Sequence, residues 1–250
     1  MLILLPPSET KRAGGEADPL DLDRLALPEL RAQREAVVDA IVALSADEDE
    51  AARVLKLSAR QRPEVAVNAR LREAPTMAAV DRYTGVLFDA LDASSLDAAS
   101  RRWLGAHVMI HSAPFGPVGA LDAIPAYRLT ANASLPGVPP LKRHWSSAVS
   151  AALAAASPSF VLDLRSEAYA ALGPVPPGLP TRYVRVVTEG PDGSSRALNH
   201  FNKHAKGAFV RALAQDRPRA TTAAGLVRWA DAAGFVLRAG NAPGELDLVV

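Results

Sequence analysis

The sequence predicts an α/β fold of mixed α+β character, a single domain over residues 1–250 with a mixed β-sheet surrounded by helices. Strand-like segments lie at the start, middle and end of the chain, at Leu2–Leu5, Phe160–Leu164 and Glu245–Val249. Helical patterns fill much of the sequence between them. The composition, 49% hydrophobic and 22% charged over 250 residues, is typical of a globular protein, and no repeat or linker divides the chain.

The first part of the chain is predicted to be mainly helical once the opening strand has ended. A loop runs to about Ala26, and Pro28 then suits the first turn of a helix that continues to Leu44. Ser45 is expected to cap a second helix, whose acidic first turn Asp47–Glu50 suits a helix N-terminus. Further helices are predicted at Pro63–Arg72, at Pro75–Leu91 with a break at Tyr83–Gly85, and at Ser95–Leu104.

The rest of the chain alternates between strands and helices. The other predicted strands are Val108–His111, Tyr183–Thr188, Ser195–Leu198 and Phe235–Arg238. The predicted helices are Leu141–Ala156, Glu167–Leu172, Asn202–Gln215 and Thr221–Ala233. A long loop is expected from Pro114 to about Pro140, and Gly190-Pro191-Asp192-Gly193 is a hairpin signal between two strands.

The composition excludes several classes of protein. The chain has no cysteine, which excludes disulfides, thiolate catalysis and cysteine-ligated metals. The apolar run at Leu2–Leu5 is too short for a signal peptide, and no stretch approaches the ~18 apolar residues of a membrane span. A soluble, cytoplasmic protein without a membrane partner is therefore expected.

The basic residues are clustered although the total charge is balanced. The chain carries 28 basic and 27 acidic residues, a formal net charge of +1, so the total does not indicate nucleic-acid binding. Residues 53–72 and 199–219 are nevertheless each strongly basic, whereas residues 39–50 are acidic. A local phosphate-binding surface is compatible with this distribution.

The segment from Asn199 to Arg211 is the most informative. On a helical wheel, Lys203, Lys206 and Arg211 fall opposite the apolar side, with Gly207 among them. A glycine there would let a phosphate approach the backbone between cationic side chains. The alternative is an ordinary solvated helix face. His200 and His204 have metal-ligand spacing, but no glutamate completes a zincin motif, so neither a metal nor a cofactor is predicted.

Three other segments could supply polar groups to a ligand. Tyr83-Thr84-Gly85 could bind a phosphate through its hydroxyl groups, or simply end a helix. Gly116 and Gly119 could offer backbone N–H groups to an anion, although they form no Walker or dinucleotide motif. The run Asp163 to Glu167 follows a strand, where open α/β sheets bind ligands, and Asp163 or Glu167 could act as a general base. Alternatively, Ser166 caps the next helix and Arg165 pairs with a nearby acid.

Several motifs, in order along the chain, resemble the YaaA-type peroxide-stress protein family in an actinobacterial-like form. They are Met1–Lys11, Tyr83-Thr84-Gly85, Phe115-Gly116 through Leu121-Asp122, Pro125-x-Tyr127-Arg128-Leu129, Trp145 at the start of a long helix, Leu164–Tyr169, and His200–Lys203 with Lys206-Gly207. The sequence departs from the family pattern at Ala113-Pro114, where the family generally has glycine and leucine. The resemblance covers nearly the whole chain.

The resemblance implies a YaaA-like fold with a positively charged cleft and a helix–hairpin–helix-like element. It also implies a DNA-binding protein of the peroxide-stress response that limits iron-dependent damage. The expected partner is double-stranded or structured DNA, bound through phosphates with weak sequence specificity. The residues predicted to contact phosphate are Lys11, Tyr83, Thr84, Gly85, Arg128, Lys142, Arg143, Arg165, Ser166, Lys203, Lys206, Gly207 and Arg211.

Two alternatives to DNA binding stay open. An enzyme acting on a nucleotide or another phosphate-containing substrate would use the same cleft. Its candidate residues are Tyr83, Thr84, Arg128, Ser166, Glu167 and Lys203. Direct iron sequestration is disfavoured by the absence of cysteine and by the small number of histidines, five in the chain.

Overall fold

The computed structural model describes residues 1–189, 195–196 and 199–250, with side chains described in 1–188 and 202–250. Within that part of the chain, a mixed sheet has the strand order β10-β11-β8-β7-β1-β4-β5, and β9 pairs with β8. Its strands are β1 (Leu2–Leu5), β4 (Val108–Ser112), β5 (Gly116–Gly119), β7 (Val161–Asp163), β8 (Thr181–Glu189), β9 (Ser195–Arg196), β10 (Val236–Ala239) and β11 (Glu245–Val249). The predicted fold class, a single mixed α/β domain, is confirmed.

The centre of the sheet is parallel and its edges are antiparallel. β1 runs parallel to both β4 and β7, so that Ile3 lies opposite Val108 on one side and Leu162 on the other. β8 continues the parallel arrangement beside β7, and β11 beside β8. β5, β9 and β10 are antiparallel to their neighbours.

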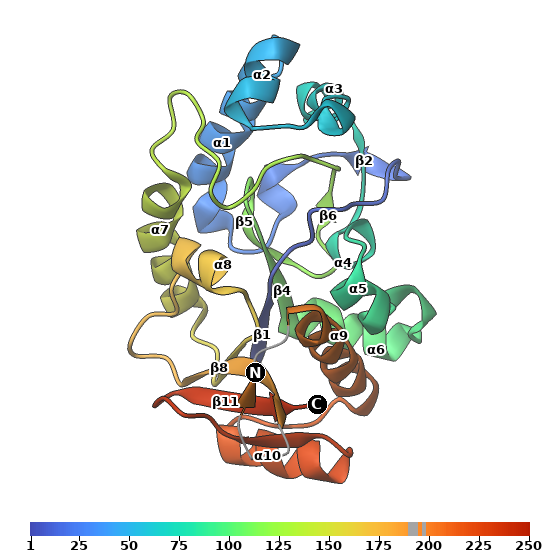
Figure 1. Cartoon of the computed structure of the whole chain (residues 1–250), viewed down its shortest axis with the longest axis vertical. Helices are drawn as coiled ribbons and strands as arrows, with labels where there is room; N and C mark the ends of the chain where they lie inside the picture. The colour runs from blue at the N-terminus through green and yellow to red at the C-terminus, as the bar shows by residue number, and fades with distance from the viewer. Residues whose placement is uncertain (190–194, 197–198) are drawn as a thin grey trace.

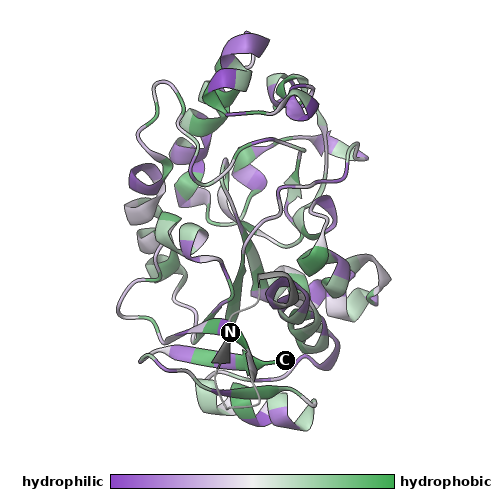
Figure 2. Cartoon of the chain, in the orientation of Figure 1, coloured by the Kyte–Doolittle hydropathy of each residue, from purple (hydrophilic) through white to green (hydrophobic). Residues whose placement is uncertain are grey.

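Helices cover both faces of the sheet, which explains why β1 is apolar at all four positions and fully enclosed. In Figure 1, α7 (Leu141–Ala156) and α8 (Glu167–Leu172) lie on one side of β1, and α5 (Val86–Leu91), α6 (Ala98–His107) and α9 (Asn199–Asp216) on the other. α10 (Ala223–Ala232) packs beside β10. The central strands and the inner helix faces are hydrophobic in Figure 2.

A second, smaller antiparallel sheet consists of β2 (Ala17–Pro19), β3 (Pro75–Ala78) and β6 (Ala123–Ile124). It lies near α1 (Arg31–Leu44), α2 (Glu48–Val54), α3 (Glu64–Ala69) and α4 (Ala79–Arg82) (Figure 1). Short 3-10 helices occupy Leu22–Arg24, Pro28–Leu30, Ala59–Gln61 and Ala93–Ser95.

This smaller sheet contradicts two predictions. Pro75–Ala78 was predicted as helix, but it is a strand because it pairs with β2 on one side and β6 on the other. The predicted loop before Ala26 likewise contains β2, and the predicted loop after Pro114 contains β6; both strands pair with β3, which is distant in sequence. The predicted loop after Pro114 also contains β5, which belongs to the larger sheet and forms a hairpin with the neighbouring strand β4. Ser45 does not cap α2; the Asp47 side chain accepts a hydrogen bond from the Glu50 N–H instead.

The other predicted elements are confirmed with shifts of a few residues at their ends. Leu2–Leu5, Leu141–Ala156, Glu167–Leu172 and Glu245–Val249 have the predicted bounds. β8 and β9 pair antiparallel, as expected for strands that flank a hairpin. The predicted turn Gly190–Gly193 itself lies outside the described residues.

Candidate functional site

A cleft of about 980 Å³ lies at the carboxyl ends of β1 and β7. Its walls come from the loop after β1, the start of α5, the start of α8, the middle of β8 and one face of α9. The lining residues among those described are Pro6–Thr10, Thr84–Phe88, Ser166–Ala168, Tyr183–Val186, Asn202, Lys203 and Lys206.

The topology of the sheet places this cleft where the direction of chain winding reverses. After β1, the chain reaches β4 on one side of that strand and later returns to β7 on the other side. The two loops that leave β1 and β7 therefore separate at the sheet edge. In open α/β sheets, this switch point is the usual ligand site.

Lys206 is the most enclosed cation of the cleft. Its side chain projects from α9, is 6% exposed, and donates a hydrogen bond from Nζ to the Leu164 carbonyl oxygen at 3.0 Å. The Tyr183 ring lies 5.9 Å from Nζ. Burial lowers the pKa of Lys206 to about 8, and the negative charge of Asp163 opposes this shift.

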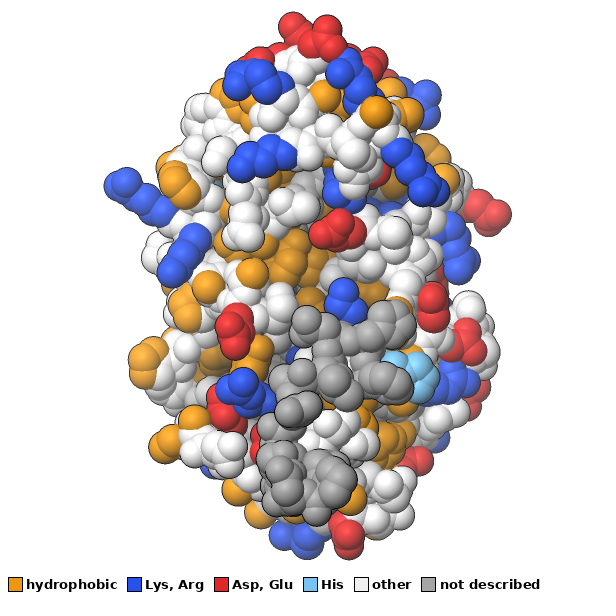
Figure 3. Space-filling model, viewed as in Figure 1, with side chains coloured by type: hydrophobic (Ala, Val, Ile, Leu, Met, Phe, Trp, Pro, Cys, Tyr) orange, Lys and Arg blue, Asp and Glu red, His pale blue; other side chains and the backbone are white. Residues whose placement is uncertain are grey.

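Lys203 lies one turn earlier on α9 and is exposed at the cleft. Among the described residues it has no hydrogen-bond or ion-pair partner. The other charged lining residues are Arg185, which pairs with Glu245 at 3.3 Å, and the carboxylates Glu9 and Glu167. Basic and acidic side chains are interspersed on the face seen in Figure 3, so the predicted basic character of the cleft stays a prediction.

The loop after β1 is held against the start of α5. The Thr84 N–H donates to the Thr10 carbonyl oxygen, and the Thr10 hydroxyl donates to the Thr84 carbonyl oxygen at 3.3 Å. Gly85 adopts φ +95°, and a side chain there would meet the Ser8 and Thr10 hydroxyl groups. The predicted residues Thr84 and Gly85 therefore line the cleft together with hydroxyl groups from the loop.

Lys11, Tyr83 and Arg128 form a partly buried group behind this loop rather than a wall of the cleft. Lys11 Nζ donates to the Ser8 and Glu9 carbonyl oxygens and lies 4.0 Å from the centre of the Tyr127 ring. Burial and then the charge of Arg128 lower the pKa of Lys11 to about 7. The Tyr83 hydroxyl is buried and shares a 2.8 Å hydrogen bond with Tyr127.

Arg128 connects that group to two acidic side chains. Its guanidinium pairs with Glu9 at 3.4 Å and with Glu64 at 3.9 Å, and its side chain is only 12% exposed. Neither Tyr83 nor Arg128 is among the described residues that line the cleft. Their arrangement supports the loop that carries Glu9.

Arg165 is fully buried and makes structural contacts, as in the alternative considered for the sequence. It makes a two-point ion pair with Asp163, with Nη2 2.6 Å from Oδ2, and donates to the Gly173 carbonyl oxygen and to His111 Nδ1. Because Nδ1 accepts, His111 Nε2 carries the proton, and it has no partner among the described residues. Burial, then the charge of Arg165, lowers the pKa of His111.

The residues around the end of β7 thus have two roles: some hold the structure together and others are exposed at the cleft. Asp163 is committed to Arg165, which leaves it unsuited to act as the general base considered for it. Ser166 stands at the N-cap position of α8, yet its hydroxyl makes no capping hydrogen bond and is exposed in the cleft. Glu167 lies beside it and is also exposed.

Gly207 and Arg211 face α5 and not a ligand, which corrects the helical-wheel interpretation. A Cβ atom at Gly207 would clash with the Leu87 carbonyl oxygen. The glycine therefore permits the close approach of α9 to α5. Arg211 donates to the carbonyl oxygens of Leu91 and Asp92 at the C-terminus of α5. The wheel separated polar from apolar residues but could not show that another helix covers this side.

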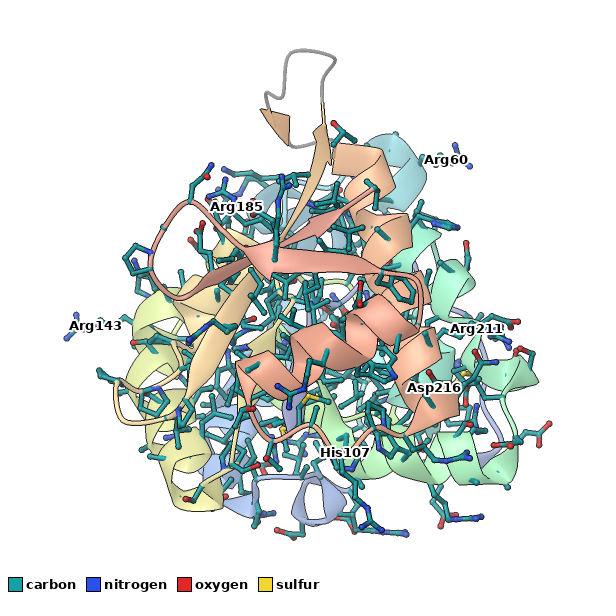
Figure 4. The ribbon with its side chains drawn as sticks, turned by 90° about the horizontal axis from the view of Figure 1, so that it is seen from below. Arg60, His107, Arg143, Arg185, Arg211 and Asp216 are labelled. Carbon is teal, nitrogen blue, oxygen red and sulfur yellow. The ribbon has the colours of Figure 1, made fainter. Side chains whose placement is uncertain are left out.

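Lys142 and Arg143 are exposed at the start of α7, away from the cleft. Figure 4 shows Arg143 and Arg211 on opposite sides of the molecule. Lys142 and Arg143, which were also predicted to contact phosphate, therefore do not line the cleft with Lys203 and Lys206. They follow Pro140 at the N-terminus of α7, which packs on the other side of the sheet.

The cleft also contains residues that the sequence did not single out. Ser8, Glu9 and Thr10 follow β1 as Ser166 follows β7, so the strand-end rule already used for β7 would have found them. Tyr183 and Arg185 lie within β8 and carry no local signal. Their position became apparent only because β8 extends past the end of β7.

No metal-binding group is present among the residues whose side chains are described. His200, one of the two histidines with metal-ligand spacing, has a side chain outside those residues. In the same part of the chain, no helix is long and apolar enough to cross a membrane.

The fold and the cleft define a mixed α/β protein with a cleft at the switch point of its sheet. The family model described as peroxide stress protein YaaA matches residues 1–240. A UPF0246 protein of Corynebacterium efficiens is 44% identical over the full length of both chains, and one of Streptomyces coelicolor is 41% identical over all of this chain and 98% of its own. The chain belongs to the YaaA peroxide stress protein family.

Proposed function

We propose that this protein binds double-stranded or structured DNA through phosphate contacts at the cleft, with weak sequence specificity. It would act in the cytoplasm during the peroxide-stress response and limit iron-dependent damage to the bound DNA. Membership of a peroxide stress family supports the cellular role. The geometry of the cleft supports the phosphate contacts.

The unpaired cation Lys203 is the observation that carries this proposal. It is exposed at the cleft and lacks a hydrogen-bond or ion-pair partner among the described residues, so an incoming phosphate does not have to displace a carboxylate. The hydroxyl groups of Thr84 and Ser166 line the same cleft and can donate to phosphate oxygens. These contacts involve no base edge, which is why weak sequence specificity is proposed.

A fluorescence-anisotropy titration of a labelled duplex at increasing salt tests the proposal. Each neutralised phosphate contributes about −0.9 to the slope of log K against log salt. We expect Lys203→Ala to weaken binding several-fold and to make that slope less steep by about one unit. Lys142→Ala, which removes the same charge outside the cleft, is the matched control and should bind like the unmodified protein. No binding at low salt, or equal effects of the two variants, would contradict the proposal.

The second candidate function is an enzyme acting on a nucleotide or a similar phosphate-containing compound. Its support is the cleft volume, about 980 Å³, which is within the range of small-molecule sites. The candidates that line the cleft are Thr84, Ser166, Glu167 and Lys203, whereas Tyr83 and Arg128 lie outside it. Thermal-shift measurements with nucleotides and sugar phosphates test this function: stabilisation that Lys203→Ala abolishes supports it, and an unchanged unfolding temperature with every compound argues against it.

A further inference from the structure

The position of Lys206 combines features that DNA binding through phosphates does not use. A phosphate contact needs only a charged, accessible group, as Lys203 provides. Lys206 instead is nearly enclosed, and its Nζ is held by the Leu164 carbonyl oxygen at the end of β7. This hydrogen bond fixes the amine at the wall of the cleft. Leu164, which accepts it, lies two residues before Ser166, which also lines the cleft.

The choice of lysine at this position matters chemically. Only five of the 28 basic residues of this chain are lysines, and the rest are arginines. An arginine could donate to Leu164 equally well, but a guanidinium does not lose its proton in a protein. A lysine that is partly neutral near pH 7 to 8 is a nucleophile.

We propose that Lys206 is an amine nucleophile that forms an imine with an aldehyde of DNA bound in the cleft, the ring-opened sugar of an abasic site. This inference rests on the proposed DNA binding. An abasic deoxyribose carries an aldehyde at C1′ when its ring is open, next to phosphates on both sides. Lys203 is one turn away on α9 and can hold one of those phosphates while Nζ of Lys206 meets the aldehyde.

The reaction balances without any further reagent. Nζ of the neutral amine attacks the aldehyde carbon, and the carbonyl oxygen takes up a proton to become a hydroxyl group. The proton that remains on the nitrogen then passes to that hydroxyl group as the C=N bond forms, and the hydroxyl group leaves as water. One amine and one aldehyde give one imine and one water. Ser166 and Glu167 line the same cleft and can accept or return the proton.

The surroundings of Nζ favour the neutral amine. Among the residues whose side chains are described, the titratable and charged groups facing it are Tyr183 on β8 and Asp163 at the end of β7, and the Asp163 carboxylate is already paired with Arg165. With a pKa of about 8, roughly one Lys206 in ten is neutral at pH 7, against about one in 3,000 for an ordinary lysine of pKa 10.5. That difference is about 300-fold in available nucleophile.

Reductive trapping tests the proposal. The protein is incubated with a duplex containing one abasic site and with sodium cyanoborohydride, which reduces an imine to a stable secondary amine. We expect a covalent protein–DNA adduct, which peptide mapping should locate at Lys206. Lys206→Arg should lower the yield at least 10-fold, and Lys142→Arg, outside the cleft, should leave it unchanged. The trapping rate should rise with pH and level off above about pH 8, which a purely structural lysine would not produce.

A duplex with a tetrahydrofuran residue separates the two levels of the proposal, because it resembles an abasic site but has no aldehyde. Binding to this duplex without trapping of the abasic one would overturn the imine and leave DNA binding intact. Absence of binding to it would overturn both. An adduct located at Met1 or at another lysine would also overturn the assignment to Lys206, even where Lys206→Arg fails to fold, since the map is made on the unmodified protein.

Discussion

Among the described side chains, those of Arg34, Arg82 and Arg165 are fully buried. Arg34 donates to the carbonyl oxygens of Ala26, Phe115 and Pro117, which belong to segments far apart in sequence. Arg82 similarly donates to the carbonyl oxygens of Arg12, Gly14, Pro75 and Ile124. At the residue scale, arginine therefore joins loops by satisfying their backbone acceptors, because its fork of donors reaches several carbonyl groups at once.

Arg165 differs from the other two because it also has a carboxylate partner. Replacing it with alanine would leave Asp163 as a buried charge without its counter-ion. We expect Arg165→Ala to lower the free energy of unfolding by about 3–5 kcal/mol, measured by urea denaturation. Arg53→Ala removes the exposed ion pair with Glu50 and should cause no measurable loss. Equal effects of the two variants would show that the Asp163 pair is not buried in solution.

The sequence could not distinguish these roles. Arg165 and Lys203 both appear as cations in polar segments, but one is fully buried and the other is exposed at the cleft. The distinction depends on which segments cover the side chain, and those segments are remote in sequence. The strand-end rule did point to the segment after β7, whose residues Ser166 and Glu167 line the cleft, because a strand's C-terminus is a local feature.

At the scale of elements, the contact between α5 and α9 forms one side of the cleft. α5 has only six residues, and its C-terminal carbonyl groups are capped by Arg211 from α9. Gly207 brings the two helices together, with Leu87 and Ala90 directly opposite. Thr84–Phe88 and Lys203 can share one cleft because the helices approach so closely.

Gly207→Ala tests this contact. Alanine is favoured over glycine inside a helix by about 1 kcal/mol, so propensity alone predicts a more stable protein. The added Cβ would overlap the Leu87 carbonyl oxygen, and a backbone atom cannot move aside cheaply. We expect the overlap to dominate, with a net loss of about 1–3 kcal/mol in urea denaturation. Ala208→Gly, the neighbouring control, should lose about 1 kcal/mol through propensity alone. A stabilised Gly207→Ala variant would contradict the packing of α5 on α9.

Elements with local signals were predicted well and elements without them were not. The alanine-rich α7 begins after Pro140, and β1 is an apolar run that is followed by two prolines. In both cases neighbouring residues in the sequence mark where the element begins or ends. β3 consists of Pro75–Ala78, four residues that become a strand only through pairing with β2 and β6. Such pairing depends on residues more than 40 positions away, beyond the reach of periodicity.

At the scale of the whole molecule, buried ionisable groups make stability depend on pH. Lys11 and Lys206 have pKa values lowered mainly by burial, to about 7 and about 8. Tyr83 and Tyr127 have pKa values raised by burial. In both cases the folded protein favours the neutral form of the side chain over its charged form.

The sign of the pH effect follows from proton uptake. Between about pH 7 and pH 10.5, unfolded Lys11 and Lys206 bind protons that the folded protein does not bind, so the free energy of unfolding rises with pH. Above about pH 10, unfolded tyrosines ionise before the folded ones, and the free energy falls again. Maximum stability is therefore expected between about pH 9 and 10, well above neutrality.

Urea denaturation at half-unit steps from pH 7 to 11 measures this curve. In Lys206→Met and Lys11→Met, the rise between pH 7 and pH 9.5 should become shallower, because each removes one group whose proton uptake differs between the two states. As the pH rises, the slope of each variant should begin to fall below that of the unmodified protein near pH 8 for Lys206→Met and near pH 7 for Lys11→Met, in the order of the two pKa values. Lys142→Met changes an exposed lysine on α7 and should leave the curve unchanged. A free energy of unfolding that is flat or falling from pH 7 to 9.5 would mean that both amines are solvated in the folded protein. In that case Lys206 would also lose the enclosure on which its nucleophilic role depends.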